Sequence, residues 1–359
     1  MKDYFRPDLA GKQPSEINVP VRKHMLCLNE SCLDPYQAIK ADFLQRMESI
    51  RLNRYLSPVT EELHTRLAAY AGLDKARIVW GNGADDLLYH IFLAVRWDDN
   101  AFAVSLAPSY FDYKTFCGMV GLKIRFVDLQ EDLSFDTREY LRLASDPDCR
   151  LAILCNPNNP TGNLFSPEQL SLIVETLPDK LVLIDETYHE FSGATFASEL
   201  DLHPNLILIR SFSKAFSGAG LRFGYALSRE ENIHSLRKVL TTFHTSILNQ
   251  AFALTILENS TLFQAHVRDV ISMRDSMQGR LQELPGVRVF PSHTNFLTFS
   301  VGDDTAALFE HLKDHEVAVR DVRAHPLLRD CLRLTIGCEE DNRAFMSALE
   351  TFLTNRQQA

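Results

Sequence analysis

Short runs of apolar residues alternate along the chain with segments whose apolar positions recur at the helical period. Four runs are almost entirely apolar, at residues 101–105, 151–155, 181–185 and 206–211. Strands buried on both faces have this composition, and they occur in parallel sheets that carry helices on both sides. The pattern therefore predicts an α/β fold with a mostly parallel sheet.

Helical spacing is found between and around these runs. It covers residues 35–50, 59–70, 85–95, 109–119 and 167–176, and one long region at 249–283, while shorter strands are expected at 78–80 and 223–227. From residue 287 onward the pattern reads βαβ-like, with strands at 287–290, 295–299, 317–320 and 332–336 and helices at 305–313 and 341–353. We expect a large domain over 51–250, a connecting helix over 251–283 and a small α/β domain over 284–359. Residues up to about 26 are expected to be irregular.

Length, charge and cysteine content narrow the class of protein. A chain of 359 residues exceeds what one hydrophobic core usually serves, which agrees with two domains. The net charge of −10 argues against a nucleic-acid partner. No stretch reaches the roughly 18–20 apolar residues of a membrane span, and residues 1–20 are polar and interrupted by prolines, so we expect neither a signal peptide nor an anchor. The seven cysteines lack CxxC spacing and are odd in number, which favours reduced thiols and a cytoplasmic location.

Polar clusters follow four of the expected strands, where open α/β sheets bind ligands. The clusters are 81–85 (GNGAD), 156–162 (NPNNPTG), 185–188 (DETY) and 211–214 (SFSK). If the strands share one sheet, a lysine, an acid, hydroxyl groups and a helix N-terminus meet in one crevice. Pyridoxal phosphate needs these groups: an amine for its aldehyde, an acid for its ring nitrogen, and donors for its phenolic oxygen and phosphate.

The order and spacing of these segments resemble the fold-type I, class I and II aminotransferases, and most closely the histidinol-phosphate aminotransferase group. The resemblance runs from about residue 26 to the C-terminus and rests on Asn29-Glu30, Tyr55, 81–85, Pro108-Ser109-Tyr110, 156–162, 185–188, 211–225 (SFSKAFSGAGLRFGY), Asn295-Phe296 and 332–337 (LRLTIG). It implies pyridoxal 5'-phosphate as cofactor and a large domain built on a seven-stranded type of sheet. It also implies that residues 1–50 join the small domain and cover the active site. The implied reaction is a ping-pong transfer of an amino group, by default from L-histidinol phosphate to 2-oxoglutarate.

The resemblance also implies a role for each candidate residue. Lys214 would bind the cofactor covalently and act as general base, and Asp185 would pair with the ring nitrogen. Asn159 and Tyr188 would hold the phenolic oxygen, and Tyr110 would stack on the ring. The phosphate would be held by Gly83, Ala84, Asp85, Ser211, Ser213 and Arg222, and by Tyr55 of a second subunit, which implies a homodimer with shared sites. Arg333, Arg320 and Asn29 would bind the substrate.

Two segments depart from the group where a substrate side chain is expected. The usual N-x-N-E-N-P-[YF]-G reads CLNESCLD at 27–34, followed by RYLS at 54–57 in place of R-Y-P-D. Residues 240–248 (LTTFHTSIL) replace a segment with P-[YF]-N-V. The donor could therefore be an aromatic or other amino acid, and a pyridoxal-phosphate-dependent decarboxylase or cyclase could use the same site. A non-catalytic binding protein is a third possibility, against which the retention of Lys214, Asp185 and Arg222 speaks.

Several of these residues also have a purely structural interpretation. Asp185 could cap a helix, the NPTG segment could be only a turn, and Arg320 could form a structural ion pair. Their occurrence together favours the site. His311 and His315 have the spacing of metal ligands on a helix, but no third ligand lies near them in sequence, so we expect an exposed helix face and no metal.

Overall fold

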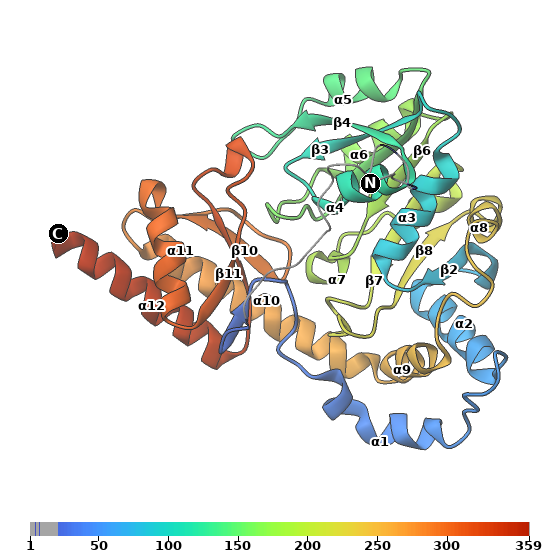
Figure 1. The fold of residues 1–359 in the computed structure, drawn as a ribbon, viewed down its shortest axis with the longest axis horizontal. Helices are drawn as coiled ribbons and strands as arrows, with labels where there is room; N and C mark the ends of the chain where they lie inside the picture. Colours follow the sequence, from blue (N-terminus) through green and yellow to red (C-terminus); the bar gives the residue numbers. More distant parts are fainter. Residues whose placement is uncertain (1–3, 5–6, 8–20, 359) are drawn as a thin grey trace.

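The computed structural model describes residues 4, 7 and 21–358, and it contains two separate sheets (Figure 1). The expectation that the first twenty residues form neither signal peptide nor anchor lies almost wholly outside the described residues. Across the described part of the chain, no helix combines the length and the apolar character needed to cross a membrane.

The larger sheet has seven strands in the order β2-β8-β7-β6-β5-β3-β4. Their bounds are β2 Ile78–Gly81, β3 Phe102–Ala107, β4 Lys123–Asp128, β5 Cys149–Cys155, β6 Leu181–Asp185, β7 Leu206–Ser211 and β8 Gly224–Ser228. Neighbours are parallel except for β8, which is antiparallel to both β7 and β2. β2 therefore runs in the same direction as β7, and the chain leaves β2, β5, β6 and β7 at one edge. The predicted α/β fold with a mostly parallel sheet is confirmed.

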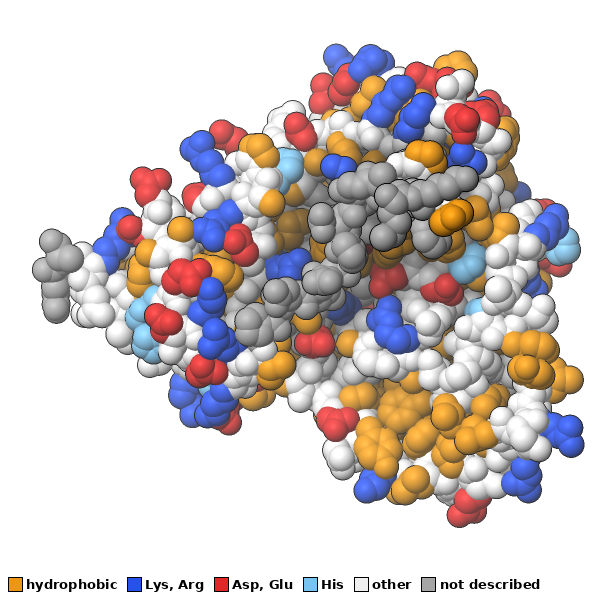
Figure 2. Space-filling model, viewed as in Figure 1, with side chains coloured by type: hydrophobic (Ala, Val, Ile, Leu, Met, Phe, Trp, Pro, Cys, Tyr) orange, Lys and Arg blue, Asp and Glu red, His pale blue; other side chains and the backbone are white. Residues whose placement is uncertain are grey.

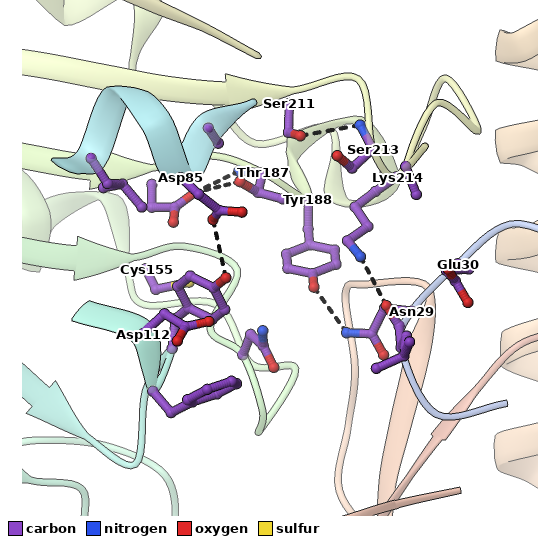
Figure 3. A pocket seen from close by; sticks show the side chains of 18 of the residues that line it. Asn29, Glu30, Asp85, Asp112, Cys155, Thr187, Tyr188, Ser211, Ser213 and Lys214 are labelled. Carbon is purple, nitrogen blue, oxygen red and sulfur yellow. Dashed lines mark hydrogen bonds between the residues drawn. The ribbon is translucent and has the colours of Figure 1, made fainter. Parts of the chain in front are cut away.

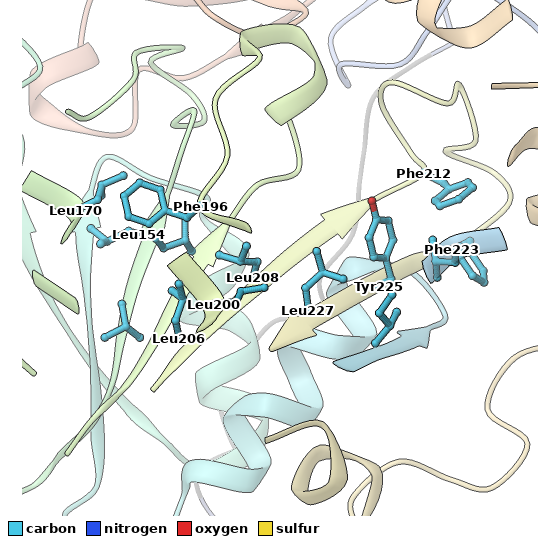
Figure 4. Close-up of a cluster of buried hydrophobic side chains, with 14 of the residues drawn as sticks. Leu154, Leu170, Phe196, Leu200, Leu206, Leu208, Phe212, Phe223, Tyr225 and Leu227 are labelled. Atoms are coloured by element: carbon cyan, nitrogen blue, oxygen red, sulfur yellow. The ribbon is translucent and has the colours of Figure 1, made fainter. Parts of the chain in front are cut away.

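Helices cover both faces of this sheet because successive side chains of each strand enter opposite cores. Along β5, Leu151 and Ile153 pack with helices α3 (Ala84–Val95), α4 (Asp112–Val120) and α8 (Glu230–Arg237). Ala152 and Leu154 face the other way, toward α2 (Pro58–Ala71), α5 (Thr137–Ala144), α6 (Pro167–Thr176) and α9 (Ile247–Glu258). Figure 4 shows part of this second core, where Phe212, Phe223 and Tyr225 meet leucines of β7 and β8. Burial on both faces explains why the strands are apolar throughout.

The smaller sheet has five strands in the order β1-β11-β12-β10-β9. They are β1 His24–Leu26, β9 Arg288–Val289, β10 Phe296–Ser300, β11 Val317–Asp321 and β12 Leu332–Thr335, packed with α10 (Ser260–Glu283), α11 (Thr305–Asp314) and α12 (Glu339–Gln358). β12 lies between β10 and β11 and is antiparallel to both, so the βαβ unit expected around α11 is split by a third strand. β1 pairs in parallel with β11 and attaches the N-terminal segment to this sheet.

Three sequence expectations need correction. Residues 24–26 are a strand, because they pair with a partner almost 300 residues away and are too short to show a periodic pattern. The helical region expected at 249–283 is two helices, α9 and α10, which meet at Asn259. The pattern also missed β4, α5 and α8; β4 is a mostly exposed edge strand, so its side chains lack the apolar run of its neighbours.

The remaining elements are α1 (Pro35–Met47), α7 (His189–Ser192) and the 3-10 turns Lys75–Arg77, Ala197–Asp201, Gly302–Asp304 and Pro326–Leu328.

Candidate active site

A cavity of about 350 Å³ lies at the edge where β2, β5, β6 and β7 end, between the two sheets (Figure 3). The structure brings most of the predicted site residues to its wall: Asn29, Ala84, Asp85, Tyr110, Asn159, Asp185, Tyr188, Ser211, Ser213, Lys214, Arg222, Arg320 and Arg333. The remaining wall residues, to none of which the sequence analysis had given a role, are Leu28, Glu30, Leu88, Phe111, Asp112, Cys155, Thr187, Ala219 and Gly220.

Lys214 follows β7 and extends into the cavity. Its Nζ donates a hydrogen bond to the Leu28 carbonyl at 2.9 Å, so the N-terminal segment lies directly over the amine (Figure 3). Burial lowers the pKa of Lys214 to about 8, and the positive charge of Arg333 acts in the same direction. A lysine that loses its proton near neutral pH has a nucleophilic amine available for a carbonyl group.

Asp185 is the last residue of β6 and is buried. Its carboxylate accepts hydrogen bonds from the Tyr113 hydroxyl at 2.8 Å, from the Thr187 hydroxyl at 2.6 Å and from the Thr187 N–H at 3.0 Å. Burial raises the pKa of Asp185, and these hydrogen bonds oppose that rise. The carboxylate is thus placed to pair with a cationic N–H. Tyr113 was missed in the sequence because a tyrosine on a helix is ordinarily a core residue.

The first turn of α3 and the loop before β8 form one wall of the cavity. No side chain caps α3, so its first N–H groups are open to an anion, as at other helix N-termini. Arg222 Nη2 lies 2.9 Å from the Asp85 carboxylate, which also accepts from the Tyr110 hydroxyl at 3.1 Å. Gly83 caps this turn rather than lining the cavity, and its φ of +96° is one that glycine adopts without strain. A Cβ at Gly83 would lie 2.5 Å from Arg222 Nη2.

Arg333 comes from the small sheet and reaches across the cavity. Its guanidinium donates to the Asn159 side-chain oxygen and to the Cys27 carbonyl. Its Nε is buried and has no hydrogen-bond partner among the described residues. Burial lowers the pKa of Arg333 to about 10. Both acceptors are neutral, so the buried positive charge of Arg333 lacks a bonded carboxylate and suits an anionic ligand.

Arg320 lies directly opposite Arg333 in the register of β11 and β12. Two like charges at opposed positions of a strand pair are unfavourable unless an anion lies between them. The proximity of Arg320 contributes to the lowered pKa of Arg333. The Arg320 guanidinium carbon also lies 5.6 Å from the centre of the ring of Phe111, which belongs to the half of the molecule that contains the large sheet. The two arginines and this ring thus enclose one end of the cavity.

Asn29 ties the N-terminal segment to both halves of the site. Its side-chain amide donates to the Tyr188 hydroxyl at 2.9 Å, and its backbone N–H donates to the Thr335 hydroxyl at 2.9 Å. Burial raises the pKa of Tyr188, which keeps this hydroxyl protonated. Tyr188 and Asn159 face the cavity from the ends of β6 and β5, where the sequence had placed them.

Some predicted residues lie elsewhere. Tyr55 is exposed and is not part of the cavity wall of its own chain; its ring stacks on Phe243 with centroids 4.4 Å apart. The divergent segments 31–34 and 240–248 also lie outside the wall of this cavity. His311 and His315 bond to backbone carbonyl groups, and no cluster of three or more His, Cys, Asp or Glu suited to a metal occurs in the described part of the chain.

Comparisons with known proteins agree with this geometry. The fold is that of the fold-type I transferases: a crystal structure of histidinol-phosphate aminotransferase from Sinorhizobium meliloti, in complex with pyridoxal-5'-phosphate, superposes with a TM-score of 0.85 at 23% identity and covers 100% of this chain and 99% of its own. L-threonine-O-3-phosphate decarboxylase from Porphyromonas gingivalis has the same fold, with a TM-score of 0.78 at 23% identity over 92% of this chain and 99% of its own.

The sequence comparisons define the family. The family model for class I and II aminotransferases matches residues 22–349. Histidinol-phosphate aminotransferase 2 of Nitrosococcus oceani is 34% identical over 311 residues, which are 86% of each chain. The chain therefore belongs to the class I and II aminotransferase family, and the predicted family, enzyme class and pyridoxal-phosphate cofactor are confirmed.

Proposed function

We propose that this protein is a pyridoxal-phosphate-dependent aminotransferase that moves the amino group of L-histidinol phosphate to 2-oxoglutarate by a ping-pong route. One observation carries the proposal: Lys214, Asp185 and the opposed Arg320 and Arg333 line the same cavity. A reactive amine, a buried acid and a double anion site are what such a reaction requires. The relative from Nitrosococcus oceani, whose name specifies histidinol phosphate, supports that donor.

The cavity fits the cofactor group by group. The uncapped start of α3, Ser211, Ser213 and Arg222 would hold its phosphate, with Gly83 leaving room for Arg222. Asp185 would hold its ring nitrogen, Asn159 and Tyr188 its phenolic oxygen, and Tyr110 the face of its ring. When bound, pyridoxal phosphate supplies an aldehyde that captures amines and a ring that withdraws electrons from the carbon bearing the amine.

The side chains of this chain would perform the remaining work. Lys214 Nζ would accept the proton that leaves the amine-bearing carbon of the donor and would deliver it to C4′ of the cofactor, and in the second half-reaction it would move a proton from C4′ to the carbonyl carbon of 2-oxoglutarate. Arg333 and Arg320 would bind the phosphate of the donor, and Arg333 would bind a carboxylate of 2-oxoglutarate in the same place. The N-terminal segment over Lys214 would exclude water from the amine.

A donor screen on the purified, cofactor-loaded enzyme tests this proposal. Histidinol phosphate, aromatic amino acids and other amino acids are each added without acceptor, and the change in visible absorbance of the bound cofactor is recorded. 2-Oxoglutarate should then restore the original spectrum and yield glutamate, and Lys214→Ala should abolish both steps. Release of carbon dioxide without glutamate would show a decarboxylase instead. If the enzyme turns over only another donor, the transaminase chemistry stands and that donor replaces histidinol phosphate as the proposed substrate.

A homodimer with shared sites is part of the proposal. Figure 2 shows apolar side chains gathered over α1 and α9, at the lower right of the molecule. The exposed apolar residues of these elements and of the neighbouring loops are Tyr36, Leu44, Leu52, Tyr55, Leu56, Phe243 and Leu248. An exposed apolar patch of this kind is typical of a protein interface, and a second copy of the chain would cover it and bring Tyr55 to the neighbouring site.

All seven cysteines are unpaired, and the cytoplasmic location stays a prediction.

A further inference from the structure

The divergent segment that begins at Ser31 has a defined place in the structure, although it lies outside the cavity wall. The residues just before it cover the site: the Leu28 carbonyl accepts from Lys214, and Asn29 contacts Tyr188. Ser31 follows Asn29 by two positions and contacts Ser217, in the loop after Lys214, and His266 of α10. Its contacts therefore influence how firmly the cover is held.

Ser31 is bonded to two elements that are distant in sequence. The Ser217 hydroxyl donates to Ser31 Oγ at 2.8 Å, and the Leu33 N–H donates to the same oxygen at 3.1 Å. Ser31 Oγ also lies 2.8 Å from His266 Nε2. A hydroxyl has two lone pairs and one proton. Since both lone pairs are occupied, the proton of Ser31 is donated to His266, and the hydrogen-bonding capacity of this serine is fully used.

The two partners lie on elements that matter to the reaction. Ser217 follows Lys214 by three residues in the same loop, where its amide donates to the Lys214 carbonyl at 3.1 Å and its φ is +55°. His266 lies on α10, which packs against the small sheet through Val267 and Val270. Burial lowers the pKa of His266, which favours the neutral ring, and Nε2 accepts from Ser31 in the tautomer that carries its proton on Nδ1. The bonds of Ser31 thus join residues 28–30, the loop that carries Lys214, and α10.

We propose that Ser31, together with Ser217 and His266, is a positioning group that locks the segment 28–30 over the amine of Lys214 and so sets the affinity for the amino donor. The inference rests on the proposed function, because it assigns these residues to the same site. It also gives a role to the Ser31 departure: a serine hydroxyl bonds at this point to groups of the large domain and of α10.

The expected effect follows from the lost hydrogen bonds. Each is worth about 1 kcal/mol net, and some of the freed groups will bind water instead. Ser31→Ala should therefore raise the KM for the donor by about 10-fold, which corresponds to 1.4 kcal/mol, while kcat changes by less than about 3-fold. The visible spectrum of the bound cofactor should not change, since Ser31 is not part of the cavity wall.

The experiment compares Ser31→Ala, Ser31→Thr and His266→Leu in the cofactor-loaded enzyme. Hydrogen exchange of the peptide spanning residues 27–33 is measured beside KM and kcat. Ser31→Ala and His266→Leu should both raise KM and speed exchange, their double variant should show less than the summed effect, and Ser31→Thr should restore the wild-type values. Ser49→Ala is the matched control, because that exposed hydroxyl follows the end of α1 and donates to the nearby Arg46 carbonyl.

Two results would overturn the inference: an unchanged KM in Ser31→Ala, or unchanged exchange of residues 27–33. Thermal unfolding of each variant shows whether it is folded. If Ser31→Ala does not fold, His266→Leu tests the same hydrogen bond. A wild-type enzyme without transaminase activity would refute the proposed function instead, while the exchange measurements would still decide whether Ser31 locks the segment.

Discussion

Lys214 owes its chemistry to its surroundings, because burial and the charge of Arg333 lower its pKa to about 8. The neutral amine is the form that reacts with acylating reagents. Labelling of Lys214 in the cofactor-free protein should therefore rise as the pH passes through 8 and level off above it, whereas an ordinary lysine continues to rise toward about pH 10.4. Acetic anhydride labelling over a pH series, followed by mass spectrometry, measures this profile. A Lys214 profile like that of the exposed lysines would contradict the assignment.

Tyr113 is one of the residues that the sequence analysis missed, and it contacts Asp185 directly from helix α4. Its hydroxyl donates to the buried carboxylate at 2.8 Å, and a hydrogen bond to a charged group is worth about 1.5–3 kcal/mol. Tyr113→Phe should raise the pKa of Asp185, weaken its hold on the ring nitrogen and lower kcat by about 10- to 150-fold. A pH titration of the visible absorbance of the bound cofactor should shift as well.

The matched control for Tyr113 is Tyr140→Phe. Tyr140 is equally buried, but its hydroxyl donates to the backbone carbonyl of Ile153 away from the cavity. That variant should lose stability without any shift in the titration. If both variants behave alike, the contact of Tyr113 with Asp185 has no functional consequence.

At the scale of elements, the pairing of β11 with β12 creates the anion site. It places Arg320 opposite Arg333 although the two are 13 residues apart, and either strand alone presents a single arginine. Arg333→Ala should damage both half-reactions by about 10- to 150-fold in kcat/KM, because donor and acceptor use the same site. Arg320→Ala should chiefly lower kcat/KM of the half-reaction with the amino donor when that donor carries a phosphate, which has a higher negative charge than a carboxylate. Single-turnover measurements of each half-reaction separate these effects; equal losses in Arg320→Ala would argue against a phosphate at this position.

The start of α3 depends on a close approach by β8. A Cβ on Gly224 would lie 2.4 Å from the Ala84 backbone nitrogen, so alanine must displace the turn that offers its N–H groups to the cavity. Gly224→Ala should cost about 1–3 kcal/mol of unfolding free energy and weaken cofactor binding. Gly279→Ala in α10 is the control: a Cβ meets nothing within 4 Å there, and alanine should stabilise the helix by roughly 0.5–1 kcal/mol. Denaturant unfolding and cofactor titration measure both; normal cofactor affinity in Gly224→Ala would refute the role of this turn.

At the scale of the whole molecule, the exposed position of Tyr55 makes a prediction about subunits. If Tyr55 serves the site of its partner, Lys214→Ala and Tyr55→Ala variants should each be inactive or weak alone. A mixed dimer would contain one site with both wild-type residues, so activity should appear when the two variants are exchanged together. If Tyr55 acted within its own chain, no mixed site would be intact and no activity would return. Light scattering of the wild type should give the mass of a dimer, and an active monomer would refute the shared site.

How much of the structure the sequence predicts differs between these scales. Apolar runs predicted the central strands of the large sheet because strands buried on both faces must be apolar, and the motifs that follow them predicted Lys214, Asp185, Asn159 and Arg222. These signals are local, since each lies within a few residues of one strand. The domain bounds and the roles of the site residues stay predictions.

What only the tertiary structure decided depends on groups that are far apart in the chain. β1 exists because β11 offers it an edge, Tyr113 reaches Asp185 from another element, and Arg320 meets Arg333 through strand register. The contacts of Ser31 with Ser217 and His266 span about 200 residues. A local pattern records whether a residue is buried and how often such residues recur, but not which distant side chain lies within 3 Å of it. The chain alone thus determined the class of fold and the chemistry at the strand ends, and the packing of the segments determined how the site is held and covered.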